Sequence, residues 1–124
     1  MILDRELKPG QLWFHYKHPA NLYEIIGISV ASRETVSQAL YVAKKEDTLE
    51  NLGVYITSKG NLKLYKVKLN DDGTFKTLTK VVKEPHVIYQ SKVDGQVWAR
   101  LYDNFVEVVS TGEGTNFYRF TRVE

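Results

Sequence analysis

Hydrophobic and polar residues alternate along most of the chain, and turn residues interrupt the alternation at short intervals. Alternation with a period of two is typical of strands with one buried face, whereas a helical face recurs about every three to four residues. The pattern therefore predicts a mainly antiparallel β domain. The expected strands and hairpins cover residues 11–16, 22–30, 54–69, 74–82, 87–101 and 105–122.

The turns inside these segments predict three hairpins. Asp94-Gly95 separates two β-type runs and is a strong short-range hairpin signal. Residues 58–61 are expected to form the turn of the hairpin in 54–69, and Gly112-Glu113-Gly114 the tip of the last hairpin. A short turn is expected at 101–105, between the second and third hairpins.

Two irregularities predict bulges in the strands. Gly27 interrupts the apolar run of 22–30, where a glycine indicates a bulge or a tight bend. In 62–69 the apolar positions change parity between Leu64 and Val67. Because a strand alternates strictly, such a change indicates either a bulge or burial on both faces.

Residues 35–46 fit two kinds of secondary structure. Residues 35–38 match a capping box, and four apolar residues from Val36 to Ala43 follow the spacing of one helical face. The same apolar residues also suit a strand, so the helix is favoured and the strand stays open. Residues 47–50 predict one further helical turn ending near Gly53.

The composition predicts one globular domain. The chain has 124 residues, near the usual size of a single domain (roughly 100–150 residues), and 8 Tyr, 5 Phe and 2 Trp provide apolar bulk for a core. No long linker or internal repeat divides it. We therefore expect a single domain over 1–124, mainly β: a small SH3-like barrel or roll of antiparallel strands with one short helix at most.

Six short motifs occur in an order that resembles a known family. They are FHYK at 14–17, NLYEIIG at 21–27, ET at 34–35, VIY at 87–89, WAR at 98–100 and FVE at 105–107. The ordered set resembles the DUF1653 family, a short bacterial domain of unknown function. The resemblance implies a fold and its boundaries but no activity.

The resemblance covers about residues 9–35 and 87–120, which it identifies as the core of the domain. Residues 36–86 have no counterpart, so the resemblance implies an inserted β-hairpin segment at a loop, where added length costs little closure entropy. Arg33 and Leu101 depart from the family pattern, which has Ser and Pro at those places.

Composition excludes several classes of site. The chain has no cysteine, so disulfides, thiolate metal sites and cysteine nucleophiles are ruled out. The sequence starts without an apolar signal region and has no run of about 18 apolar residues, so we expect a cytoplasmic protein without membrane association. With 17 basic and 15 acidic residues the net charge is +2, too small to indicate nucleic acid by itself.

The motifs of catalytic and metal sites are weak. His15 and His18 would point to opposite faces of a strand, so we expect no metal and no cofactor. No Gly-x-Ser-x-Gly nucleophile motif occurs. A small enzyme with Glu34 or His15 as general base stays the least favoured hypothesis, and a non-enzymatic protein is preferred.

The favoured function is a binding or interaction module with a surface around Trp98 and Arg100. Bulky aromatic side chains there would line a pocket, and Arg100 would anchor an anionic ligand or a peptide. Arg100 and Glu34 are expected to pair across the mouth of the barrel. The predicted ligand-binding residues are Tyr16, Tyr23, Glu34, Tyr89, Trp98, Arg100 and Phe105.

The alternative function is binding of single-stranded nucleic acid through the lysine-rich segment 57–83. This segment holds seven lysines against Asp71 and Asp72, a charge of +5, with a tyrosine between the lysines. Solvated lysines that protect a strand edge, or an acidic protein partner, explain the same pattern. Both a monomer and a homodimer remain open. The residues of this alternative are Lys59, Lys63, Tyr65, Lys66, Lys68, Lys76 and Lys80.

Overall fold

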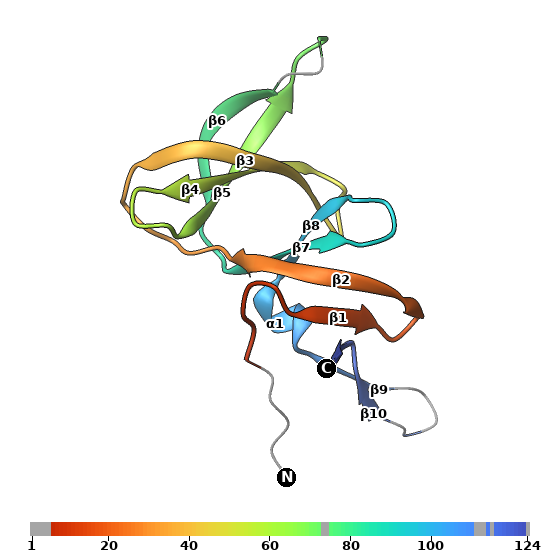
Figure 1. Cartoon of the computed structure of the whole chain (residues 1–124). Coiled ribbons are helices and arrows are strands. Elements are labelled where there is room, and N and C mark those ends of the chain that lie inside the picture. Colours follow the sequence, from red (N-terminus) through yellow and green to blue (C-terminus); the bar gives the residue numbers. More distant parts are fainter. Residues whose placement is uncertain (1–5, 73–74, 111–113, 115, 124) are drawn as a thin grey trace.

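The computed structural model describes residues 6–72, 75–110, 114 and 116–123, without the side chains of 69 and 75–79. These residues form eleven strands and one short helix, which confirms the predicted mainly β class (Figure 1). The elements are β1 (Leu12–His15), β2 (His18–Ile28), β3 (Val36–Lys45), β4 (Asn51–Thr57), β5 (Leu62–Leu69), β6 (Phe75–Val82), β7 (His86–Ser91), β8 (Val97–Leu101), α1 (Tyr102–Phe105), β9 (Val108–Ser110), β10 (Asn116–Tyr118) and β11 (Phe120–Val123).

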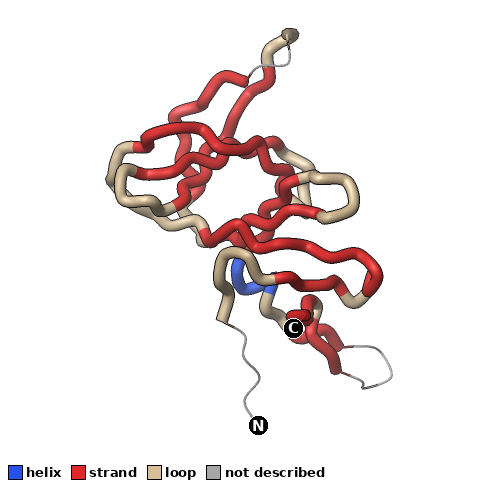
Figure 2. Tube along the Cα trace, in the orientation of Figure 1, coloured by secondary structure: helices blue, strands red, loops and turns tan. Residues whose placement is uncertain are grey.

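Nine of these strands form one sheet in the order β11-β1-β2-β7-β8-β3-β4-β5-β6. Neighbouring strands are antiparallel except β3 and β8, which run parallel. The sheet curls until the end of β2 meets β5, where Ser29 and Leu62 form an isolated bridge (Figure 2). No sheet is closed within the described residues, so the predicted SH3-like barrel is not confirmed.

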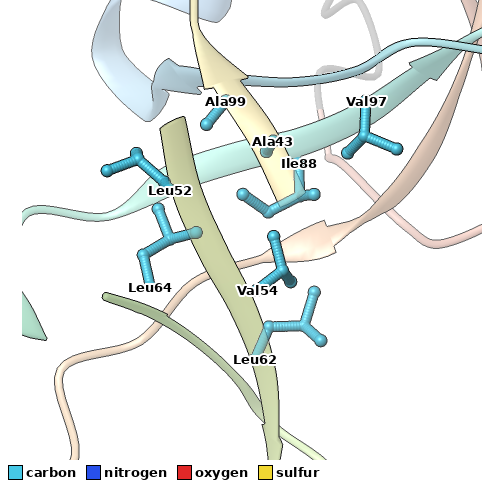
Figure 3. Close-up of a cluster of buried hydrophobic side chains, with 8 residues drawn as sticks. All are labelled: Ala43, Leu52, Val54, Leu62, Leu64, Ile88, Val97 and Ala99. Atoms are coloured by element: carbon cyan, nitrogen blue, oxygen red, sulfur yellow. The ribbon is translucent and has the colours of Figure 1, made fainter. Parts of the chain in front are cut away.

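The curled sheet buries two apolar clusters. One combines strands β3–β5 with β7 and β8 (Figure 3), and the other combines β1, β2, β7, α1 and β11. The first cluster joins residues of 36–86 to Ile88, Val97 and Ala99, so the middle of the chain packs into the same core as β7 and β8. The predicted boundaries of core and insertion stay predictions. The fully buried large side chains include Trp13, Tyr89, Phe105, Phe120, Ile25, Leu52, Leu64 and Ile88.

The helix favoured for 35–46 is wrong, because residues 36–45 form β3. This strand pairs along its length with β4, and its end pairs with β8, so its backbone groups are bonded to neighbouring strands. β-Branched and aromatic residues such as Val36 and Tyr41 favour a strand once such partners exist. The helical turn expected at 47–50 is wrong as well. The chain turns there, Leu49 has a φ of 58°, and β4 begins at Asn51.

Both predicted bulges are present. The register between β2 and β7 shifts between Ile25 and Gly27, and that between β5 and β6 shifts between Tyr65 and Val67. A Cβ atom on Gly27 would lie 2.8 Å from Cδ1 of Leu62. Gly27 therefore permits the close approach of β2 to β5 that curls the sheet.

The hairpin of β7 and β8 is confirmed, with Asp94-Gly95 in its connection and Gly95 at a φ of 77°. The last predicted hairpin is only partly right. β9 pairs with β10, but β11 leaves that pair and bonds to β1 at the edge of the large sheet. Residues 112–113 of its predicted tip lie outside the described residues. The turn expected at 101–105 is the short helix α1.

Candidate functional site

A cleft of about 390 Å³ lies where β1, β2, β7, β8 and β11 meet the end of β3. We call it the cationic cleft. It contains Tyr23, Tyr89, Trp98 and Arg100, four of the seven residues predicted to bind a ligand. The strand order brings them together, because β2, β7 and β8 are consecutive in the sheet. The cleft is lined by His15, Lys17, His18, Tyr23, Glu46, Tyr89, Trp98, Arg100, Arg119 and Phe120.

Packed aromatic rings of the second apolar cluster lie beneath the residues that line this cleft. Phe105 and Phe120 stack with ring centroids 4.0 Å apart, and the ring of Tyr89 lies 5.4 Å from that of Phe105 in a T-shaped arrangement. Trp13 makes a further T-shaped contact with Phe105 at 5.6 Å. Phe105, which was predicted to bind the ligand, is fully buried and supports the cleft without lining it. A rigid base of this kind holds the lining side chains in one geometry.

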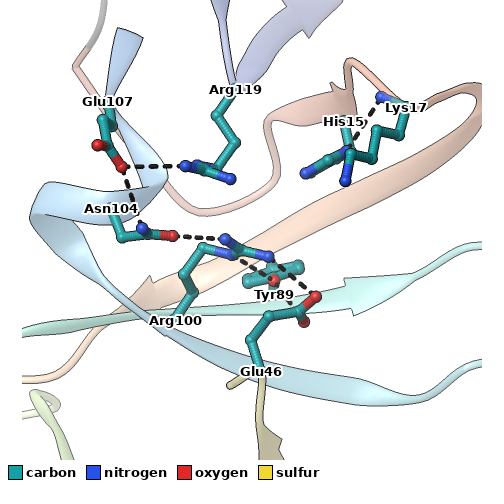
Figure 4. Close-up of polar contacts among 8 residues, drawn as sticks. All are labelled: His15, Lys17, Glu46, Tyr89, Arg100, Asn104, Glu107 and Arg119. Atoms are coloured by element: carbon teal, nitrogen blue, oxygen red, sulfur yellow. Dashed lines mark hydrogen bonds and ion pairs between the residues drawn. The ribbon is translucent and has the colours of Figure 1, made fainter. Parts of the chain in front are cut away.

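Arg100 is the central charged group of the cleft. Its Nη2 pairs with Oε1 of Glu46 at 2.9 Å, and its Nε–H donates to the hydroxyl of Tyr89 at 3.4 Å (Figure 4). The Tyr89 hydroxyl in turn donates to Oε2 of Glu46 at 3.2 Å. Nη1 of Arg100 donates to the side chain of Asn104 in α1. Only 11% of the Arg100 side chain is exposed, so these partners fix its orientation.

The network continues from α1 to Arg119, the residue before β11. Asn104 donates from Nδ2 to Oε2 of Glu107 at 3.0 Å, and the same carboxylate pairs with Arg119 at 3.1 Å. Figure 4 shows the side chains of Arg100, Arg119, His15 and Lys17 around one space. Strands β1 and β8, the turn between β1 and β2, and the bend between β10 and β11 therefore bring cationic or hydrogen-bond-donating groups to the same cleft.

The charge of the lining is positive. Lys17, Arg100 and Arg119 oppose one lining carboxylate, Glu46. Burial, reinforced by the positive charges of Arg100 and Arg119, lowers the pKa of His15 from 6.5 to about 4. Nδ1 of His15 accepts a hydrogen bond from the backbone N–H of Lys17 at 3.1 Å. The neutral ring therefore carries its proton on Nε2.

The pKa of His15 gives a first test. We expect its ring signals in NMR spectra to titrate with a midpoint near 4, below the ordinary 6.5. A histidine whose pKa is lowered in the folded protein resists protonation there, so its contribution to stability holds above pH 6.5 and is lost as the pH falls toward 4. Burial also lowers the pKa of His86, so this residue contributes to the same pH dependence.

The matched variant is His15→Asn, whose side-chain oxygen can still accept from the N–H of Lys17. The free energy of unfolding should fall less steeply between pH 6.5 and 4 in this variant than in the native protein, because the variant lacks a histidine whose pKa is lower in the folded than in the unfolded state. A His15 midpoint near 6.5, or identical pH profiles for the two proteins, would contradict the positive field of the cleft.

Two predicted ligand residues lie elsewhere. Tyr16 packs on Phe117 at 4.8 Å and lines a separate shallow depression beside β10. Glu34 accepts a hydrogen bond from Ser58 beside the β4–β5 turn, and this bond is the main cause of its lowered pKa. The predicted pairing of Arg100 with Glu34 is wrong, since Arg100 pairs with Glu46.

Six residues that line the cleft were not among the predicted ligand-binding residues: His15, Lys17, His18, Glu46, Arg119 and Phe120. Lys17 and Arg119 each adjoin an aromatic residue in sequence, and this juxtaposition of charge and ring is a signal that was available. Glu46 had no such signal. It reaches Arg100 only because the end of β3 runs beside β8, a pairing between residues more than fifty positions apart.

The lysine-rich segment does not present its lysines on one free surface. Lys63 is buried, with its Nζ donating to the backbone carbonyls of Ser32 and Glu34. Lys66 pairs with Glu50 at 3.4 Å, and Tyr65 packs against a neighbouring ring. Lys59, Lys68 and Lys80 are exposed, whereas the side chain of Lys76 lies outside the described residues.

The comparisons with known proteins add no family. No protein-family model, no curated protein and no solved structure matches the chain. In the part of the chain that the structure describes, no three His, Asp or Glu side chains gather as a metal site would require. The one described helix, α1, has four residues, far too few to cross a membrane. The resemblance to DUF1653 stays a prediction based on its ordered motifs.

Proposed function

We propose that this protein is a non-enzymatic binding module whose cationic cleft takes a small anionic ligand with a planar ring. The observation that carries the proposal is the convergence of Lys17, Arg100 and Arg119 on a cleft with aromatic walls and a single lining carboxylate. Ligand pockets combine such apolar walls with a few polar groups that fix orientation, and volumes of about 300–1,000 Å³ are usual.

Each part of the cleft has a role in this proposal. Arg100 is held by Glu46, Tyr89 and Asn104 before any ligand arrives, so little side-chain entropy is lost on binding. Lys17 and the Nε2–H of His15 supply further donors to an anionic group. Trp98, which is only partly buried, offers a face for a planar ring.

The resemblance to DUF1653 bears on this proposal because most residues of the cationic cleft lie in the stretches that resemble the family. Nine of the ten belong to the DUF1653-like stretches 9–35 and 87–120, and Glu46 alone belongs to the proposed insertion 36–86. We propose that the family-like core supplies the binding surface and that the insertion supplies the carboxylate that orients Arg100. Nucleic-acid binding through 57–83 is the weaker alternative, because Lys63 and Lys66 already hold other groups.

Two probes of equal shape test the proposal. Benzenesulfonate carries a permanent negative charge, and benzenesulfonamide is its neutral counterpart. In an NMR titration at neutral pH, benzenesulfonate should shift the signals of His15, Lys17 and Trp98 and saturate, whereas benzenesulfonamide should cause much smaller changes. Equal responses to the two probes, or shifts confined to other surfaces, would refute an anion site here.

A pair of charge variants controls for the overall charge of the protein. Lys17→Gln removes a charge from the cleft, and Lys92→Gln removes one that pairs with Glu24 outside it. Lys17→Gln should weaken benzenesulfonate binding about two- to fivefold, as expected for an exposed charge, and Lys92→Gln should leave it unchanged.

A further inference from the structure

A second cleft lies on the concave side of the sheet, beside β4, β5 and β6. We call it the lysine cleft. Its volume is about 730 Å³. It shares no lining residue with the cationic cleft, so an inference about it is independent of the proposed function. It is separated from the cationic cleft by the end of β3, where Lys45 lines the lysine cleft and Glu46 the cationic cleft. It is lined by Lys45, Glu50, Leu52, Lys66, Lys80, Val81, Val82, Lys83 and Glu84.

The strand register places two of these lysines on the core-facing side of the sheet. Lys66 lies opposite Leu52, which is fully buried in the apolar cluster. Lys45 follows Ala43 of the same cluster by two residues, so both point to the same face. Lysines that merely keep a strand soluble belong on the outer face. Their place on the concave face needs another explanation.

The charges in this cleft are unbalanced. Four lysine ammonium groups oppose the carboxylates of Glu50 and Glu84. Lys66 pairs with Glu50 at 3.4 Å. Within the described residues, none of the other three lysines of the cleft, Lys45, Lys80 and Lys83, forms an ion pair. Three lysines from separate elements thus face one space with a single further carboxylate on its lining.

We propose that the lysine cleft binds a small oligophosphate, that is, a ligand with two or more linked phosphate groups. Lysine is a compact point charge that binds phosphate without fixed geometry, unlike the planar fork of arginine. Cations that come from β3, β5, β6 and the segment after β6 suit a ligand whose charges are spaced along a chain. Leu52, Val81 and Val82 form the apolar part of the lining, beside the exposed Lys80 and Lys83.

Isothermal titration calorimetry with inorganic phosphate, pyrophosphate and tripolyphosphate tests this proposal. Affinity should increase along the series and should fall as salt is added. Lys45→Gln and Lys80→Gln should each weaken tripolyphosphate binding about tenfold, since each removes one charged contact. The matched controls are Lys59→Gln and Lys68→Gln, which remove exposed charges outside the cleft and should change the affinity less than about twofold.

NMR mapping on the native protein provides a readout that needs no variant. Tripolyphosphate should shift the backbone signals of Leu52 and Val82, and benzenesulfonate should not. Equal losses of tripolyphosphate affinity in the cleft variants and the control variants would show a nonspecific attraction to lysines and would overturn the proposal. The absence of tripolyphosphate binding to the native protein would overturn it as well. Because Lys80→Gln leaves the cationic cleft intact, its benzenesulfonate affinity should be native, so failure of one site is distinguishable from failure of the other.

Discussion

Phe105→Ala should lower the free energy of unfolding by about 3–5 kcal/mol, the largest effect that we expect of a single substitution. Phe105 has no exposed surface, stacks on Phe120 and makes T-shaped contacts with Trp13 and Tyr89. Removing its ring leaves a cavity among rigid aromatic neighbours that cannot collapse to fill it. Since small domains are stable by roughly 5–15 kcal/mol, much of the total is lost.

Urea denaturation followed by tryptophan fluorescence measures this effect. Phe14→Ala is the matched control, because Phe14 is only half-buried and lines an open depression, so it should lose much less stability. Should Phe105→Ala fail to fold, Phe105→Leu keeps most of the volume and retains a measurable transition. Equal losses for Phe14→Ala and Phe105→Ala would contradict the buried position of Phe105.

Arg100→Met should weaken benzenesulfonate binding at least about tenfold and lower the free energy of unfolding by about 1–3 kcal/mol. The variant removes the central guanidinium and leaves the carboxylate of Glu46 with the hydroxyl of Tyr89 but without its ion-pair partner. That carboxylate then repels an anionic probe, so the loss of affinity has two causes. Because the Glu46 side chain is 37% exposed, water offsets part of the loss of stability.

A double-mutant cycle separates these causes. Arg100→Met combined with Glu46→Gln removes both charges, so the double variant should lose less stability than the sum of the two single variants. Its benzenesulfonate affinity should also exceed that of Arg100→Met alone. Strict additivity in stability would show that the contact between Arg100 and Glu46 contributes nothing, contrary to its 2.9 Å geometry.

Local patterns explain why much of the fold was predictable. Alternation, the Asp94-Gly95 turn and the position of Gly27 depend on neighbouring residues only, and they predicted the β class, a hairpin and a bulge correctly. Pairings between distant residues were out of reach. The apolar positions of 35–46 satisfy helical and strand spacing alike, and only the contacts of β3 with β4 and β8 decide between them.

The candidate site also has a part that the sequence could predict and a part that depends on contacts between distant residues. Tyr23, Tyr89, Trp98 and Arg100 were identified because they are aromatic residues and an arginine at positions of the DUF1653-like motifs, and all four line the cleft. Residue type could not show that Glu34 lies at the β4–β5 turn, because that depends on where the curled sheet brings the chain. For the same reason the lysine-rich strand β5 divides its lysines between buried, paired and exposed positions.

The pKa of His15 during ligand binding tests the anion site most directly. NMR titration of the His15 ring with and without saturating benzenesulfonate gives two midpoints. Since an opposite charge in contact with an imidazole favours its protonated form, the midpoint should rise from about 4 toward 6.5 when the probe is bound. An unchanged or lower midpoint, with benzenesulfonate bound, would place the anion away from Lys17, Arg100 and Arg119 and contradict the proposed cleft.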